Sequence, residues 1–215
     1  MRTLVIGDCN FSSWSLRPWL AAKQAGIAFE EVRVRLRRPG TAAAIQRHSP
    51  SGKVPCLIDG EGDAAIVVWD SLAICEYLAE LAPGLWPADR AARAEARAVS
   101  AEMHAGFAAL RNAMGMDIRA SRPGEGRTPE ALADIARIVA IWEGCRARHA
   151  AGGPFLFGAF SIADAMYAPV VWRFVTHAVE VPPASRAWME TLLALPAMRE
   201  WQAGALAEAA PDAGD

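Results

Sequence analysis

Two adjacent serines, Ser12 and Ser13, stand where the apolar run "TLVIG" gives way to a stretch with helical spacing, "SSWSLRPWL". A hydroxyl in the first turn of a helix can accept a hydrogen bond from a backbone N–H and cap the helix. It can also donate its proton to an anion that the helix N-terminus attracts. The residue types leave both roles open, and Leu16 and Leu20 face the core in either case.

A second polar pair, Asp70 and Ser71, begins another predicted helix, "SLAICEYLAEL". Its first backbone N–H groups favour an anion, and plain capping of the helix is the alternative. Val54 and Pro55 lie between a loop and a predicted strand. A cis Val54–Pro55 bond would leave the Val54 N–H and C=O free to pair with an extended peptide, whereas a trans proline would simply begin the strand.

The composition predicts a globular protein, because 53% of the 215 residues are hydrophobic, enough for one large or two small domains. There are 22 Lys and Arg residues against 24 Asp and Glu, and the resulting charge of -2 favours neither nucleic acid nor an anionic membrane. The N-terminal apolar run is too short for a secretion signal, and no stretch approaches the length of a membrane span. We therefore expect a cytoplasmic protein.

The four cysteines lie far apart in the sequence, with no C-x-x-C pair and no histidine at zinc spacing: Cys9, Cys56, Cys75 and Cys145. We expect reduced thiols and no metal. Cys9 lies just before the serine pair, so it can form a mixed disulfide, with a buried structural thiol as the alternative.

The first part of the chain alternates predicted strands and helices. The strands are 2–7, 29–36, 54–60 and 64–70, and the helices are 12–26, 41–48 and 71–81. A helix separates the first two strands, which should be parallel, and the turn-rich "DGEGD" joins the last two, which should be antiparallel. This order is that of an α/β thioredoxin-like domain, which we place at residues 1–81.

Beyond this domain the sequence predicts helices alone. Pro83, Gly84 and Pro87 indicate a linker at 82–90, and an all-α domain follows at 91–215. Apolar residues recur at three- and four-residue steps and predict one helix face, made of Val99, Met103, Phe107, Leu110 and Met114.

Further helices are marked by their starts. Thr128 caps a helix with Pro129 at its first position, and its predicted buried stripe is Leu132, Ile135, Val139 and Trp142. Ser161 and Asp164 have the spacing of a capping box. Pro196 begins the last helix, and residues 208–215 are expected to form a frayed tail.

Four motifs in this order resemble those of the cytosolic glutathione transferase family. "SPSGKVPCL" is similar to N-P-x-G-x-V-P-x-L, with Ser49 in place of Asn, and "WDSLAICEYL" to E/Q-S-x-A-I-x-x-Y-L, with Asp70 in place of Glu or Gln. "FSIADAMYAPVV" resembles the S/T-x-x-D box of the helical domain. "SSWSLR" resembles the S-S-C-x-x-R start of the serine-type zeta class, with Trp14 in place of Cys. The resemblance covers nearly the whole chain and implies a thioredoxin-like domain followed by an all-helical one.

The resemblance also implies glutathione as co-substrate and gives roles to the residues that match. Ser71 would receive the γ-glutamyl carboxylate and Asp70 the ammonium group. Val54 would pair with the cysteinyl backbone, so we expect the Val54–Pro55 bond to be cis. Lys53 would meet the glycine carboxylate, with a solvated surface lysine as the alternative.

The sulfur of glutathione would then lie near the first helix. A free thiol has a pKa of about 8.5, and a serine O–H together with a helix N-terminus favours the thiolate. Ser12 aligns with the residue that contacts sulfur in serine-type relatives, and we expect Ser13 to cap the helix or support the site through its N–H. Serines here replace the C-x-x-C pair of redox relatives, so disulfide exchange at this helix is not expected.

The pocket for the electrophile is predicted between this loop and the helix after the linker. Its candidate lining residues are Phe11, Trp14, Met103, Phe107 and Arg111, with Met114 and Met116. A Met and Phe stripe at helical spacing is equally a property of an ordinary core. Arg111 and Arg173 are candidate contacts for an acidic substrate, with ordinary surface salt bridges as the alternative.

We predict a glutathione transferase that adds the thiolate to a small, apolar electrophile, as in detoxification. A non-catalytic protein-interaction module of the same fold is one alternative, and a glutathione-dependent isomerase of the maleylacetoacetate type is another. Trp14 in place of Cys and the position of Arg173, about three residues early, count against the isomerase. The family usually forms homodimers, so we expect one here, with neither nucleic acid nor membrane as a partner.

Overall fold

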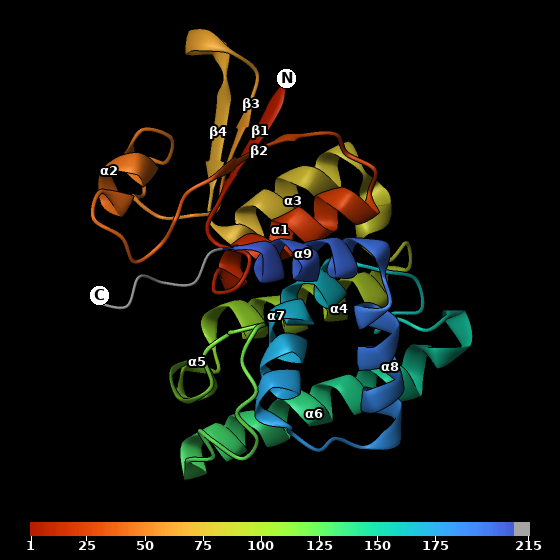
Figure 1. Ribbon diagram of the computed structural model, residues 1–215. Helices are drawn as coiled ribbons and strands as arrows, with labels where there is room; N and C mark the ends of the chain where they lie inside the picture. Colours follow the sequence, from red (N-terminus) through yellow and green to blue (C-terminus); the bar gives the residue numbers. More distant parts are fainter. Residues whose placement is uncertain (209–215) are drawn as a thin grey trace.

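The computed structural model describes residues 1–208 and shows a small sheet domain stacked on a larger group of helices (Figure 1). The strands are β1 (Arg2–Ile6), β2 (Glu30–Arg33), β3 (Cys56–Asp59) and β4 (Ile66–Trp69), in the order β2-β1-β3-β4. β1 is parallel to β2 and antiparallel to β3, and β3 is antiparallel to β4. β2 is shorter than the predicted strand 29–36, because β1, its neighbour, ends at Ile6, opposite Arg33.

Three helices cover this sheet, namely α1 (Ser13–Gln24), α2 (Thr41–Gln46) and α3 (Ser71–Leu81). Alternate residues of the strands face opposite sides of the sheet. Leu4 and Leu57 belong to the core that α1 and α3 complete, whereas Val5 and Cys56 pack with Ile45 of α2 in a second, smaller cluster. The predicted thioredoxin-like α/β domain is confirmed.

The rest of the described chain is helical, as predicted. Its helices are α4 (Arg90–Ala105), α5 (Ala108–Ala113), α6 (Pro129–His149), α7 (Ile162–His177), α8 (Pro183–Leu193) and α9 (Pro196–Ala207). Short 3-10 turns occur at Gly62–Ala64, Pro83–Leu85 and Ala150–Gly152. α7 is central and almost wholly buried, and it packs against both α1 and α4. α9 returns to lie along α1 (Figure 1).

One predicted helix is two helices in the structure. The apolar stripe from Val99 to Met114 is interrupted between Gly106 and Phe107, where α4 ends and α5 begins. Phe107 has a φ of 59°, in the left-handed region, and a Cβ on Gly106 would lie 2.8 Å from the Glu102 carbonyl oxygen. The spacing rule fails here because the backbone turns while the apolar side chains remain buried.

The buried stripe of α6 is also shifted from the predicted one. Leu132 is 45% exposed and Val139 half-buried, whereas Ile135 and Trp142 are buried as expected. The residues that face the core along this helix recur at steps of four and three: Ala131, Ile135, Ile138, Trp142 and Cys145. The α8 helix was not predicted.

The predicted helix starts are confirmed. The Thr128 hydroxyl accepts a hydrogen bond from the Ala131 N–H at 3.2 Å, and Pro196 begins α9. At α7, Asp164 accepts the Ser161 N–H at 2.9 Å, which is the reciprocal half of a capping box. Of the tail predicted at 208–215, Glu208 accepts hydrogen bonds from the β1–α1 loop, and the other residues lie outside those described.

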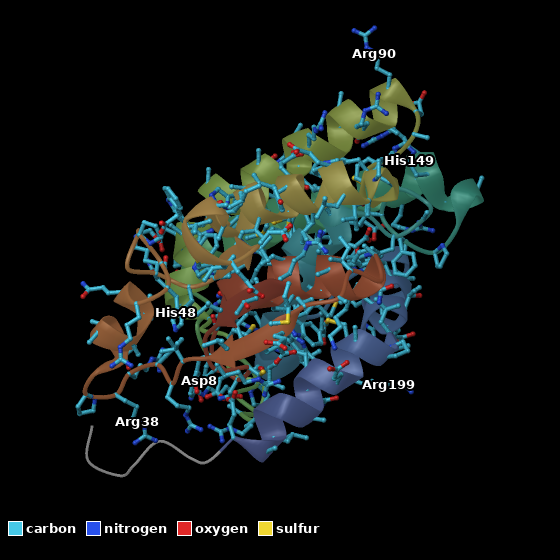
Figure 2. The ribbon with its side chains drawn as sticks, turned by 90° about the horizontal axis from the view of Figure 1, so that it is seen from above. Asp8, Arg38, His48, Arg90, His149 and Arg199 are labelled. Atoms are coloured by element: carbon cyan, nitrogen blue, oxygen red, sulfur yellow. The ribbon has the colours of Figure 1, made fainter. Side chains whose placement is uncertain are left out.

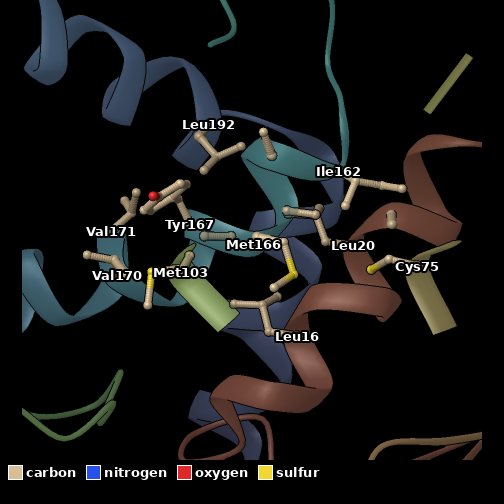
Figure 3. Packing of buried hydrophobic residues seen from close by; sticks show 14 of the residues in the cluster. Leu16, Leu20, Cys75, Met103, Ile162, Met166, Tyr167, Val170, Val171 and Leu192 are labelled. Carbon is tan, nitrogen blue, oxygen red and sulfur yellow. The ribbon is translucent and has the colours of Figure 1, made fainter. Parts of the chain in front are cut away.

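The two halves of the chain share one core (Figure 3). Leu16 and Leu20 of α1 and Cys75 of α3 lie on one side of it, and Met103 of α4 and Met166 of α7 lie on the other. Interiors are close-packed, so this shared core holds the N-terminus of α1 in a fixed position against the helical half.

Candidate functional site

A cavity of about 460 Å³ lies where the N-termini of α1 and α3 meet the loop before β3 and the end of α4. Its lining residues come from four distant parts of the sequence: Trp14, Ser51, Lys53, Val54, Pro55, Trp69, Asp70, Ser71 and His104. The fold thus brings together all five residues that the sequence assigned to glutathione binding. Within the pocket, hydrogen-bonding groups of the backbone and side chains lie beside two tryptophan rings.

The Val54–Pro55 peptide bond is cis, as predicted. The pairing of β3 with its neighbours begins at Cys56, so Val54 precedes the hydrogen-bonded ladder of the sheet. Its backbone lies at the wall of the cavity, where an extended peptide can reach it.

At the start of α3, one oxygen of Asp70 caps the helix, and other polar atoms face the cavity and can bind a ligand. Asp70 Oδ1 accepts hydrogen bonds from the Leu72 N–H at 2.9 Å and the Ala73 N–H at 3.3 Å, which caps the helix. Its other oxygen, Oδ2, lies 3.2 Å from His104 Nε2. The hydroxyl of Ser71 is buried and has no partner among residues 1–208. A buried hydroxyl without a partner is costly, and a ligand carboxylate at this helix N-terminus would satisfy it.

The two serines of α1 have different partners, and neither side chain caps the helix. The Ser12 hydroxyl donates to Ser15 Oγ at 2.7 Å, and Ser15 Oγ also accepts the Gly7 N–H at 3.1 Å. Ser13 Oγ accepts a hydrogen bond from Arg173 Nη2 at 3.2 Å. Of the two roles expected of Ser13, capping is excluded because its side chain is tied to α7 instead, and support of the site through its N–H stays a prediction. Both serines are buried beside the cavity, and neither is among its lining residues.

Two buried guanidinium groups lie behind the N-terminus of α1. Arg173 donates to the carbonyl of Met114 and, at 3.4 Å, to that of Arg111. Burial, with the charge of Arg111, lowers the pKa of Arg173 to about 10. The sequence made Arg173 a candidate contact for an acidic substrate, and the structure shows its side chain buried and occupied by backbone carbonyls and Ser13.

Arg17 is the second of these groups, and it is completely buried. Its Nε and Nη1 atoms have no hydrogen-bond partner within the described chain, and its Cζ lies 4.2 Å from the centroid of the Trp14 ring. Burial lowers the pKa of Arg17 to about 9, with a further contribution from the charge of Arg111. Both arginines stay protonated at neutral pH, so their positive charge adds to that of the helix N-terminus.

The predicted electrophile pocket is not a single pocket in the structure. Trp14 lines the cavity described above, where His104 meets its ring edge-on with the centroids 5.4 Å apart. Phe11 lines a different cavity, of about 470 Å³. Met103, Phe107 and Met114 are buried in the shared core, which is the alternative that the sequence had left open, and Met116, also buried, lines the 470 Å³ cavity with Phe11. Arg111 is half-buried, donates to the Gly106 carbonyl and lies 5.5 Å from the Trp14 ring.

The sequence missed three lining residues and the role of one buried charge. Ser51 and Trp69 adjoin recognised motifs, but nothing in their type or spacing marked them. His104 follows Met103, which the helical stripe had marked, and its approach to Asp70 depends on how α4 packs against α3. Arg17 lies inside the recognised "SSWSLR" motif, but neither its type nor its spacing indicated a role.

All four cysteines are buried and free, and burial raises the pKa of Cys9 to about 12, so its thiol is protonated at neutral pH. No group of three or more His, Cys, Asp or Glu side chains within residues 1–208 is placed to hold a metal ion. Across the same residues, the helices are all too short or too polar to span a membrane.

Comparison with known proteins agrees with this architecture. Residues 11–81 match the glutathione S-transferase N-terminal domain, and residues 91–201 match the C-terminal domain. The chain therefore belongs to the glutathione S-transferase family, a family of glutathione-using enzymes.

Individual relatives are more distant. A glutathione transferase homolog from Burkholderia, crystallised with bound glutathione, is 25% identical, with a TM-score of 0.70 over 95% of this chain and 98% of that one. A glutathione transferase from Methylococcus capsulatus is also 25% identical, with a TM-score of 0.68 over the same shares. A probable maleylacetoacetate isomerase from Caenorhabditis elegans is 36% identical over 103 residues. That match spans 46% of this chain and 45% of the relative.

Proposed function

We propose that this protein binds glutathione in the 460 Å³ cavity and activates its thiol for attack on an electrophile. The observation that carries the proposal is the composition of this one cavity. The cavity contains the Val54 backbone, which can pair with a peptide, and Lys53. It also contains the N-terminus of α3, where the Ser71 hydroxyl has no partner among residues 1–208. The start of α1 is next to it, with the buried guanidinium groups of Arg17 and Arg173. A non-catalytic module of the same fold has no use for this combination.

Glutathione would bind through its three residues in turn. The γ-glutamyl carboxylate meets the Ser71 hydroxyl and the N-terminus of α3, and the ammonium group meets Asp70 Oδ2. The cysteinyl backbone pairs with Val54, and the glycine carboxylate faces Lys53. Every charged group of the tripeptide then has an opposite charge or a hydrogen-bond donor.

The sulfur would lie at the N-terminus of α1, where Ser12 is the proposed donor. Ser15 Oγ accepts the Gly7 N–H and can donate its own proton to Ser12 Oγ, which frees the Ser12 proton for the thiolate. Such a chain of hydrogen bonds strengthens each member. Lowering the thiol pKa by about two units requires ~2.7 kcal/mol, within reach of this bond and the nearby positive charge.

A thiolate acts as a nucleophile, so the proposed reaction is its addition to an electrophile. Which electrophile reacts decides between conjugation and isomerisation. In conjugation the sulfur forms a bond to an electrophilic carbon, and a leaving group departs or a double bond takes up the electron pair. Isomerisation uses the same thiolate in a reversible addition, as the name of the Caenorhabditis elegans relative suggests. Because Arg173 is buried and occupied, we favour conjugation.

We also propose the domain boundaries, the cellular location, the oligomeric state and the classes of partner. The glutathione-binding domain is residues 1–81, the linker 82–90 and the helical domain 91–215. The protein acts in the cytoplasm as a homodimer, with no nucleic acid or membrane as a partner. Sedimentation at micromolar concentration tests the dimer, and a stable monomer would contradict it.

The first test is a pH titration of the thiolate ultraviolet absorbance of bound glutathione. We expect Ser12→Ala to raise the pKa of the bound thiol and to lower turnover by roughly 10- to 1000-fold, the loss of about 1.5 to 4 kcal/mol expected for one donor to an anion. The affinity for glutathione should change far less, because the four anchoring contacts, to Ser71, Asp70, Val54 and Lys53, remain.

Two other variants give this titration its controls. A larger defect in Ser13→Ala would move the donor role by one residue, and a defect confined to Cys9→Ala would indicate thiol–disulfide chemistry. Unchanged pKa and turnover in Ser12→Ala would refute the assignment. A panel of electrophiles tests the wider proposal, since a protein-interaction module would leave every one of them unreacted.

A further inference from the structure

A second cavity, of about 470 Å³, also adjoins the β1–α1 loop. Its lining residues are Phe11, Arg37, Gly115, Met116, Asp117, Arg119, Ala120 and Arg122. Phe11 lines this cavity and Trp14 lines the glutathione cavity, and Ser12 and Ser13 stand between them in the chain. A molecule in the second cavity would therefore lie close to the serine pair.

Arginine dominates the walls of this cavity and of a small adjoining pocket that also contains Phe11. Together they are lined by Arg35, Arg37, Arg38, Arg119 and Arg122, and by the carboxylates of Asp8, Asp117 and Glu208. Figure 2 shows Asp8 and Arg38 on the same side of the molecule, beside the end of α9. Among residues 1–208, five cations and three anions therefore line the two spaces.

Each of the three carboxylates is already engaged within the protein. Asp8 Oδ1 pairs with Arg35 at 3.0 Å, and Asp117 Oδ2 pairs with Arg122 at 3.1 Å. The Glu208 carboxylate accepts two backbone N–H groups of the β1–α1 loop, at 2.5 and 3.1 Å. The charges of Asp8 and Asp117 are thus paired with Arg35 and Arg122, whereas Glu208 is held by neutral backbone groups.

Arg37 and Arg119 have no carboxylate partner among residues 1–208, and both approach one aromatic ring. The Cζ atoms of Arg37 and Arg119 lie 4.7 and 6.0 Å from the centroid of the Phe11 ring. Arg119 Nη1 also donates to the Glu208 backbone carbonyl at 2.7 Å, which fixes the guanidinium and leaves its other N–H groups for a ligand.

We propose that this cavity binds the carboxylate of an aromatic acid, with its ring against Phe11 and its anionic group between Arg37 and Arg119. Planar guanidinium groups match a carboxylate geometrically, and an aromatic face next to a cation accommodates the ring. The proposal rests on the proposed function, and it makes the preferred electrophile an aryl carboxylate instead of a wholly apolar molecule.

The experiment compares 4-(bromomethyl)benzoate with its methyl ester. In both, the glutathione sulfur forms a bond to the benzylic carbon and bromide leaves with the electron pair of the broken bond. We expect kcat/KM, corrected for the rate with free glutathione in buffer, to be higher for the acid. Arg37→Gln and Arg119→Gln should each reduce this preference about five-fold, the upper range for an exposed ion pair, because kcat/KM falls more for the acid than for the ester.

Arg47→Gln is the matched control, because Arg47 is an exposed arginine at the end of α2, outside both cavities. It removes the same charge and should retain the preference for the acid. Equal corrected rates for acid and ester in the wild type would overturn the proposal. An equal loss of preference in all three variants would also overturn the proposal, because it would show that the preference for the acid arises from the overall charge of the protein.

A binding measurement separates this proposal from the proposed function. If neither bromide reacts, glutathione transfer fails, and calorimetry with the unreactive 4-methylbenzoate then tests the cavity alone. Binding that weakens in Arg37→Gln and Arg119→Gln and persists in Arg47→Gln would support the anion site. No binding to the wild type would overturn it.

Discussion

Two fully buried charged side chains, Asp164 on α7 and Arg17 on α1, lie on helices that pack against each other, and they differ in how far they are satisfied. The Asp164 carboxylate accepts four hydrogen bonds: from the Leu156 N–H at 2.9 Å, the Ser161 N–H at 2.9 Å, the Ser161 hydroxyl at 3.1 Å and the Trp188 indole N–H at 2.8 Å. Burial raises the pKa of the Asp164 carboxyl, and these bonds oppose that rise. Arg17 has no partner at Nε or Nη1 within residues 1–208.

This difference in hydrogen bonding indicates that the charge of Asp164 stabilises the fold and that the charge of Arg17 has a role in the candidate site. A buried charge is tolerated when hydrogen bonds replace its hydration, and Asp164 joins three segments of the helical domain by this means. Arg17 lacks such partners at Nε and Nη1 among residues 1–208, and its Cζ lies 4.2 Å from the ring centroid of Trp14, which lines the 460 Å³ cavity. We infer that Asp164 is structural and that the charge of Arg17 acts on the ligand.

The largest expected effect comes from removing the satisfied charge. Asp164→Ala leaves four buried donors without an acceptor, so we expect a loss of about 3 to 5 kcal/mol in the free energy of unfolding, measured with urea. Thr128→Ala is the control, since it removes one exposed cap, from α6, and should cost about 1 kcal/mol. A loss no larger than that of the control would contradict the structural role of Asp164.

The next largest effect comes from removing the charge of Arg17, which should change the activity and not lower the stability. We expect Arg17→Met to keep or raise the free energy of unfolding, by up to about 1 to 3 kcal/mol, because methionine fills similar space without a buried charge. The same variant should raise the pKa of bound glutathione by about one unit and lower turnover at neutral pH by about tenfold. Thiolate absorbance and urea unfolding measure the two effects separately.

Arg17→Lys keeps the positive charge and is the matched control for this variant. It should retain most of the effect on the thiol pKa, although lysine is a poorer partner for the Trp14 ring. A methionine variant that is less stable and leaves the thiol pKa unchanged would show that Arg17 is a packing residue.

The same contrast explains what could be predicted from the sequence. Asp164 was found because a capping box has a fixed spacing, and Val54, Asp70 and Ser71 were found because local motifs carry them. Contacts between helices distant in the sequence determine three features that could not be predicted. These are the buried position of the Arg173 side chain, the end of α4 at Gly106 and the contact of His104 with Asp70. Helical periodicity marked Met103 and Phe107 as apolar, but it gave no means of distinguishing a pocket wall from the core.

The smallest expected effect concerns His104, which is satisfied at one nitrogen and not at the other. Its Nε2 lies 3.2 Å from Asp70 Oδ2, and its buried Nδ1 has no partner among residues 1–208. Asp70 is already oriented by the two N–H groups that bind Oδ1, so it does not need His104 to face the cavity. At this distance His104 Nε2 instead competes with the ammonium group of glutathione for Oδ2.

His104→Phe keeps a ring against Trp14 and removes this competition. We therefore expect glutathione to bind about two- to three-fold more tightly in the variant, an effect within the range of a partly exposed ion pair. Calorimetric titration of both proteins with glutathione measures it. Weaker binding in the variant would show that His104 holds the ligand directly, and its unpartnered Nδ1 would then resemble the unpartnered hydroxyl of Ser71 in awaiting the ligand.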